Sequence, residues 1–273
     1  MIGRLINWFR RPTETRPIAA ALWQETLAGL PFLACLNQEE QGRLRLLAQA
    51  LLAEKEFSTA GGLELTDAMC VSIAAQGCLP ILNIGLDAYR GWVGIVVYPD
   101  QFVIPRAVED EFGVVHEYDD VASGEAWQGG PLLISWRDAQ MAGAGYSVVI
   151  HEFAHKLDML NGPADGIPLL PSGRARQDWE ATLLAAYDDF CGRVDQAEQL
   201  GNETRLDPYA AENPAEFFAV MSETFFEMPQ MLKEEYPALY AQLATFYRQD
   251  PALRQAAPNE RLNQVGRVSS FIA

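Results

Sequence analysis

The stretch His151-Glu152-Phe153-Ala154-His155 contains two of the three histidines in this chain of 273 residues. Apolar residues at 148–150, 154 and 157 continue the pattern of a buried helix, and Asn161-Gly162 is a dipeptide suited to ending one. On a helix, residues four apart lie on one face, one turn apart. The sequence therefore predicts a core helix whose two imidazoles can share one metal ion.

Glu152 directly follows the first histidine and projects about 100° around the helix from it. From there its carboxylate can hold a water molecule on the open side of the metal instead of competing as a ligand. This H-E-x-x-H spacing is typical of zinc metallopeptidases. The alternative interpretation is a pair of core histidines hydrogen-bonded to backbone carbonyls, which leaves the position of Glu152 unexplained.

The composition limits the classes of partner and compartment. The chain has 20 Lys and Arg against 37 Asp and Glu, a net charge of −17. This charge argues against nucleic acid and anionic membranes as direct partners and favours a basic protein or peptide. The four cysteines form no C-x-x-C pair and are expected to be reduced. Neither a signal peptide nor an apolar run of transmembrane length is evident, so we expect a cytoplasmic location.

The periodicity of the apolar residues predicts an α+β fold. We expect helices over residues 20–30, 37–57, 66–76, 174–199, 214–227 and 230–248, and strands over 91–98, 113–118 and 131–136. The domain boundaries follow from these elements: one domain at 20–250, with a helical part at 20–80 and a catalytic part at 90–250, and tails at 1–19 and 251–273.

The strand predicted at 131–136 has a potential function because it comes shortly before the H-E-x-x-H helix. Leu132, Leu133 and Ile134 would form the sheet edge beside the metal and pair with an extended peptide substrate. Gly129-Gly130 would let the two backbones approach closely. An ordinary core strand after a glycine turn explains the same residues equally well.

A catalytic zinc takes three protein ligands and keeps one position for water. No histidine follows at three or six residues beyond His155, and the remaining His116 lies in a predicted strand, where a core or surface role is the simpler interpretation. We therefore expect the third ligand to be a carboxylate on a later helix. Glu216 and Glu223 lie seven residues apart, on one face of the apolar helix at 214–227.

Zinc bound by Glu216, with Glu223 hydrogen-bonded to a ligand histidine, would compensate the burial of both carboxylates. Asn213, Pro214 and Glu216 also form a variant of the capping box that begins a helix, and a capping glutamate needs no metal. The residues by themselves therefore leave Glu216 equally open as a ligand or a cap, with Glu223 and Asp158 as rival ligands.

Longer motifs favour one of these interpretations of Glu216. Residues 151–158 and 161–162, Tyr209-Ala210-Ala211 and the stretch at 213–223 together resemble the Mlc titration factor A family of zinc metallopeptidases. The resemblance extends over about residues 23–251, and the catalytic core of the family is similar to that of anthrax lethal factor. It implies a zincin-like metallopeptidase core: a small mixed sheet, an active-site H-E-x-x-H helix, a second ligand-bearing helix and a helical N-terminal part.

By position, the resemblance implies one Zn²⁺ per chain, bound by His151, His155 and Glu216. Glu152 would be the general base that takes a proton from the attacking water. Tyr209 matches the family's active-site tyrosine, which can donate a hydrogen bond to an oxyanion.

Glu223 and Asp158 are expected beside the metal ligands, hydrogen-bonded to them. The resemblance also implies aminopeptidase-like activity on a peptide or protein substrate, and binding to Mlc, a transcriptional repressor of glucose phosphotransferase genes. The alternative is a regulator-sequestering protein with a structural or latent zinc site, although a structural zinc normally has four protein ligands and no need of Glu152. A metal-dependent hydrolase of a non-peptide bond is a third, weaker interpretation.

Overall fold

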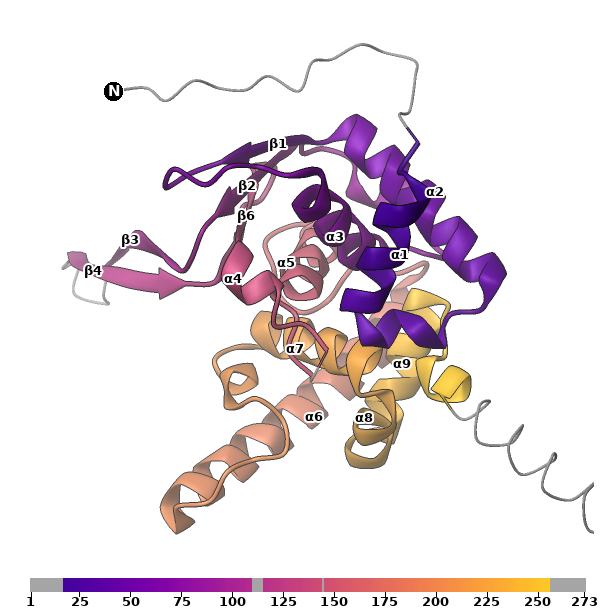
Figure 1. Cartoon of the computed structure of the whole chain (residues 1–273). Coiled ribbons are helices and arrows are strands. Elements are labelled where there is room, and N and C mark those ends of the chain that lie inside the picture. The colour runs from indigo at the N-terminus through magenta and orange to yellow at the C-terminus, as the bar shows by residue number, and fades with distance from the viewer. Residues whose placement is uncertain (1–16, 110–114, 144, 256–273) are drawn as a thin grey trace, which may run out of the picture.

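The computed structural model of the chain describes residues 17–109, 115–143 and 145–255. Its N-terminal part is helical, as predicted (Figure 1). The elements are α1 (Ala20–Gly29), the short 3₁₀ helix η1 (Pro31–Cys35), α2 (Gln38–Glu54) and α3 (Asp67–Cys78). A capping box between Asn37 and Glu40 begins α2. The helix ends three residues earlier than predicted, because Phe57 belongs to a strand, β1 (Glu56–Thr59).

The sheet has four strands in the order β1-β2-β6-β5. It comprises β2 (Gly94–Tyr98), β5 (Gly124–Ala126) and β6 (Leu132–Ser135) besides β1. The β1–β2 and β2–β6 pairs are parallel and the β5–β6 pair is antiparallel. This mixed sheet among helices confirms the predicted α+β class. The sequence missed β1 and β5, because these strands of four and three residues show neither a period of two nor the apolar run that made β6 detectable.

A separate two-stranded ribbon is formed by β3 (Phe102–Glu109) and β4 (Val115–Ala122), which pair antiparallel. It projects from the helical body in Figure 1. The prediction of a strand at 113–118 is confirmed only for its described residues, and the strand continues to Ala122. His116 lies in β4, opposite Val108 in the register.

The expectation that Leu132, Leu133 and Ile134 form a sheet edge is wrong. They lie in β6, which has β2 on one side and β5 on the other, so its backbone groups already have partners. All three side chains are buried. The edge strands of this sheet are β1 and β5, and β5 is the one that lies next to β6.

The remaining helices cover this sheet and each other. They are η2 (Leu86–Tyr89), α4 (Trp136–Ala139), α5 (Val148–Asp158), α6 (Gly173–Leu200), η3 (Pro208–Ala211), α7 (Pro214–Glu227), α8 (Pro229–Glu235) and α9 (Pro237–Tyr247). The helix predicted at 230–248 is two helices, since Pro237 interrupts it and begins α9. The helix α5 contacts β5 and β6 on one side and α7 on the other. It therefore lies at the centre of the molecule (Figure 1).

The buried apolar residues form one continuous core that runs from Ile18 to Ala252. Most of the two predicted tails lies outside the described residues, but their inner ends are packed. Ile18 and Ala252 are buried, residues 251–255 are helical, and Arg254 forms an ion pair with Glu40 at 2.7 Å. Within the described ranges, no helix combines the length and apolar composition that crossing a membrane requires.

The loop before α5 is held by a carboxylate from α7. Glu227 is buried and accepts hydrogen bonds from the backbone N–H groups of Gly143 at 3.0 Å and Gly145 at 2.7 Å. Both glycines have positive φ, 127° and 91°, which suits only glycine. Burial raises the pKa of Glu227 to about 7. This contact fixes the approach to Ser147, which caps α5 with its side chain on the N–H of Ile150.

Candidate metal centre

The orientation of α5 about its own axis is set by its apolar contacts. Every residue from Val148 to Asp158 is buried. Phe153 packs edge-on against Tyr89 and Trp92, with ring centroids 5.0 and 5.8 Å apart. Gly77 of α3 leaves the space that the Phe153 ring fills. With Phe153 fixed on this side, His151 and His155 face α7.

The N-terminus of α7 shows whether Glu216 caps the helix or faces the histidines. Asn213 caps the helix with its own side chain, which accepts from the N–H groups of Ala215 and Glu216 at 2.9 and 3.0 Å. The Glu216 carboxylate turns towards α5 instead. Its Oε2 lies 2.9 Å from Nε2 of His151 and 3.3 Å from Nε2 of His155.

These three side chains form a site that fits a metal ion. The Nε2 atoms of His151 and His155 are 3.1 Å apart, so two nitrogens and one carboxylate oxygen converge on one point. Ligand atoms about 2 Å from a tetrahedral zinc lie roughly 3.3 Å from one another, which matches these separations. Two imidazoles and one carboxylate are also the donor set of known catalytic zinc sites. The residues present therefore fit zinc, with Glu216 in the position of the third ligand.

A second carboxylate from α7 fixes the ring of His151. Glu223 is buried, and its Oε1 lies 2.8 Å from Nδ1 of His151. Its Oε2 accepts from the backbone N–H of Ser147. A carboxylate on Nδ1 keeps the proton there and leaves Nε2 free to bind a metal. Glu223 is thus hydrogen-bonded to a histidine of the candidate site, the contact that the sequence predicted.

Asp158 does not make the contact expected of it. Its Oδ2 accepts from the backbone N–H of Gly166 at 2.8 Å, so the side chain holds the loop after α5. Its Oδ1 and the Nδ1 of His155 are both buried and have no hydrogen-bond partner among the described residues. Burial raises the pKa of Asp158 to about 6. The expected hydrogen bond from Asp158 to a ligand is therefore absent from the described contacts.

Glu152 lies beside the site, against the edge strand. It is buried, and its Oε2 has no hydrogen-bond partner in the described part of the chain. A Cβ atom built on Gly124 of β5 would overlap the Glu152 carboxylate. Burial raises the pKa of Glu152 to about 8, although the nearby His151 opposes this. A carboxyl group with such a pKa readily exchanges a proton near neutral pH.

Tyr209 lies on the other side of His151, with the two ring centroids 6.1 Å apart. It belongs to η3, whose first N–H groups are capped by Asp207: the Asp207 Oδ1 accepts from the N–H of Tyr209 at 2.9 Å. The Tyr209 side chain is 53% exposed. Burial of the hydroxyl, followed by the charges of Glu216 and Glu152, raises its pKa above the ordinary value, so the hydroxyl stays a hydrogen-bond donor.

Sequence reasoning missed two residues that position the site, Gly124 and Lys156. Lys156 follows His155 directly, is buried, and donates to the carbonyls of Trp127 at 2.7 Å and Gly130 at 2.9 Å. It therefore ties α5 to the turn between β5 and β6. A lysine inside an otherwise apolar helix was the available signal, because a buried ammonium needs several acceptors.

Comparison with known proteins decides the family. The sequence model of the glucose-regulated metallo-peptidase M90 family matches residues 5–248. The chain belongs to this family. It is 40% identical to Mlc titration factor A of Salmonella arizonae over 253 residues, which cover 92% of this chain and 99% of the relative. The proteins of the same name from Shigella dysenteriae and Escherichia coli K12 are each 37% identical over 272 residues, 98% of both chains. The chain is therefore a metallopeptidase of family M90, and its candidate zinc site is His151, His155 and Glu216.

Gly124→Ala should lower the peptidase activity of this M90 site without lowering its metal content. The added methyl group overlaps the Glu152 carboxylate and displaces it, and a displacement of about 1 Å can cost on the order of 10²-fold in turnover. Metal content should stay that of the parent, since no ligand moves. The measurement is peptide hydrolysis together with metal analysis.

Gly192→Ala is the matched control, because a Cβ there meets nothing within 4 Å. Full activity of Gly124→Ala would show that the carboxylate does not need its present place.

Proposed function

We propose that this chain is a zinc-dependent peptidase with aminopeptidase-like activity in the cytoplasm, and that Glu152 activates the attacking water. The observation that carries the proposal is the convergence of three ligand atoms beside the buried carboxylate of Glu152, whose Oε2 has no hydrogen-bond partner among the described residues. A structural site would use four protein ligands and would have no use for that carboxylate.

Zinc is the metal that the donor set favours, at one ion per chain. When bound, zinc lowers the pKa of a coordinated water to about 7 and polarises a carbonyl group. His151 and His155 would bind it through Nε2, and Glu216 through Oε2. Glu223 would keep His151 in the required tautomer.

The other residues have roles that follow from their positions. Glu152 takes a proton from the attacking water and passes it to the leaving amine. The Tyr209 hydroxyl donates a hydrogen bond to the oxyanion that develops on the scissile carbonyl. An extended peptide pairs with the open edge of β5, in place of the strand at 132–134 that the sequence suggested. Gly124 in this edge leaves room for the Glu152 side chain.

Glu152→Gln tests the general base. The amide keeps the shape but cannot accept the proton, so turnover should fall by about 10²-fold or more at unchanged zinc content. The assay uses chromogenic amino-acid amides and peptides with free or acetylated amino termini, with zinc measured in parent and variant. Equal turnover of the two proteins would rule out this role for Glu152, and cleavage of acetylated substrates alone would exclude aminopeptidase activity.

Glu216→Ala tests the third ligand. Because it removes one of three donor atoms, we expect zinc occupancy to fall well below one per chain after dialysis. Metal analysis gives the occupancy, and circular dichroism shows whether α7 persists, since Asn213 still caps it. Glu25→Ala, exposed on α1, is the control. Stoichiometric zinc in Glu216→Ala would leave Glu216 without a ligand role.

We further propose that the chain binds a transcriptional repressor like Mlc. Support comes from the name of the relatives, Mlc titration factor A, and from the net charge of −17, which complements the basic face of a DNA-binding protein. Binding and peptidase activity are compatible, since a repressor can occupy a surface that the metal centre does not use.

Glu152→Gln should bind the repressor as tightly as the parent does. Glu152 is buried, so its substitution leaves the charge of the protein surface unchanged. Isothermal titration with purified repressor measures this. An unrelated DNA-binding protein of similar charge is the control. Absence of a complex, or equal binding to the control protein, would contradict specific recognition.

A further inference from the structure

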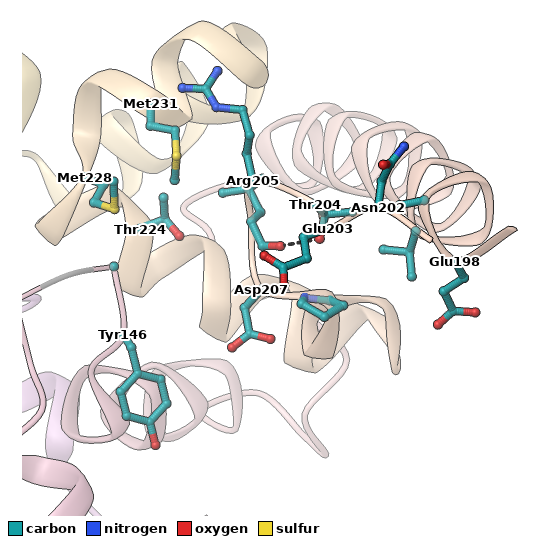
Figure 2. Close-up of a pocket in the computed structure, with 15 residues that line it drawn as sticks. Tyr146, Glu198, Asn202, Glu203, Thr204, Arg205, Asp207, Thr224, Met228 and Met231 are labelled. Atoms are coloured by element: carbon teal, nitrogen blue, oxygen red, sulfur yellow. Dashed lines mark hydrogen bonds between the residues drawn. The ribbon is translucent and has the colours of Figure 1, made fainter. Parts of the chain in front are cut away.

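A cavity of about 520 Å³ lies beside the metal centre and has no part in the roles assigned above. It is open to solvent on one side and is lined by the second half of α6, the loop at 201–207, the C-terminal half of α7 with the start of α8, and the loop before α5 (Figure 2). Val194, Leu206, Met228 and Met231 give it apolar walls. Methionine side chains adapt to occupants of different shape, so these walls suit an aliphatic segment.

The cavity is next to the active site through three of its walls. Three lining residues adjoin residues that surround the metal centre: Tyr146 precedes Ser147, the cap of α5, Pro208 precedes Tyr209, and Thr224 follows Glu223. A fourth, Asp207, caps Tyr209. The cavity therefore lies within reach of a peptide whose scissile bond is at the metal centre.

The charged groups of the cavity are mostly acidic. Glu198, Glu203 and Asp207 line it, and Arg205 is the one basic residue among the described lining residues. Arg205 is engaged elsewhere, in ion pairs with Glu235 and, at 3.7 Å, with Glu234 of α8. Figure 2 shows its side chain extending away from Asp207. The cavity thus offers negative charge around an apolar interior.

The direction of β5 indicates which part of a substrate reaches the cavity. A peptide that pairs antiparallel with β5, the commoner arrangement, runs from Ala126 towards Gly124. Gly124 lies against Glu152, so the scissile bond is near this point. Ser123 comes next along that path, and its side chain is hydrogen-bonded to the hydroxyl of Tyr146, a wall of the cavity. Residues on the carboxyl side of the scissile bond therefore run towards Tyr146, which lines the cavity.

We propose that this cavity is the subsite for a basic side chain, Lys or Arg, within two residues on the carboxyl side of the scissile bond. The inference rests on the proposed peptidase function. The aliphatic stem of the occupant packs between Met228 and Met231, and its charged end meets the carboxylates of the rim. Long basic side chains combine these two properties, whereas acidic ones are repelled.

The test uses internally quenched peptides with a free amino terminus that differ only in the two residues after the scissile bond, which are Lys, Leu, Glu or Gly. The zinc-loaded parent should cleave the Lys peptides with a kcat/KM roughly tenfold above that of the Glu peptides, mainly through a lower KM. The expected difference is no larger because exposed charge pairs are individually weak. The difference should shrink at high salt.

The double variant Glu198→Lys/Glu203→Lys separates the cavity from the catalytic centre. It should abolish or invert the preference between Lys and Glu while it cleaves the Leu peptide like the parent. Ala197→Phe is the second variant: its ring fills the cavity from α6, so KM should rise for Lys and Leu peptides but not for a Gly peptide.

Cleavage by the parent with no dependence on charge, or a preference that survives the charge reversal, would overturn this subsite and leave the peptidase intact. If zinc-loaded parent cleaves none of the peptides, the proposed function fails and the subsite fails with it.

Discussion

The contact between α5 and α7 is the constraint on which the rest of the site depends. Both helices are apolar around most of their circumference and lie in the core, yet α7 carries three carboxylates and α5 two histidines. Isolated buried charges are costly, so each carboxylate must meet a partner across the contact. Glu216 meets both histidines, Glu223 meets His151 and the N–H of Ser147, and Glu227 meets the glycine loop before α5. One helix therefore fixes the position, capping residue and ring orientation of the other.

The sheet supplies the second half of the site through different physics. The helix α5 is bound to it at two points along its length: Lys156 donates to the turn between β5 and β6, and Glu152 fills the space above Gly124. These two contacts fix the position of Glu152 relative to β5. An open strand edge is normally a hazard for aggregation, and the proposed pairing with a peptide substrate would give this one a use.

Burial of Glu152 and exposure of Tyr209 are consistent with distinct tasks. A buried carboxyl has its charged form destabilised, which makes it a stronger proton acceptor than an exposed one. The backbone of Tyr209 is fixed by the hydrogen bond from its N–H to the Asp207 carboxylate, while its ring stays accessible. The same loop forms a wall of the neighbouring cavity, so a change in the loop would affect both Tyr209 and the cavity.

The sequence by itself determined the helix at 148–158 with both histidines on one face, and the helix at 214–227 with Glu216 and Glu223 on one face. These follow from spacings of three, four and seven residues, which depend only on local helix geometry. The fold class followed in the same way. The residues themselves did not decide whether Glu216 was a cap or faced the histidines, because both interpretations satisfy the local chemistry of a helix N-terminus. The resemblance to a known family favoured the second.

Only the tertiary structure decided which strand forms the edge, that Asp158 holds the loop at Gly166 instead of a ligand, and that Gly124 and Lys156 position the site. The three-residue strand β5 has no period to read, and its neighbour β6 looks the same in sequence whether it is an edge or an interior strand. The cavity beside Tyr209 joins residues from 145 to 231 and has no sequence signature. Such features arise from contacts between distant segments, and the spacing of residues within one element carries no information about them.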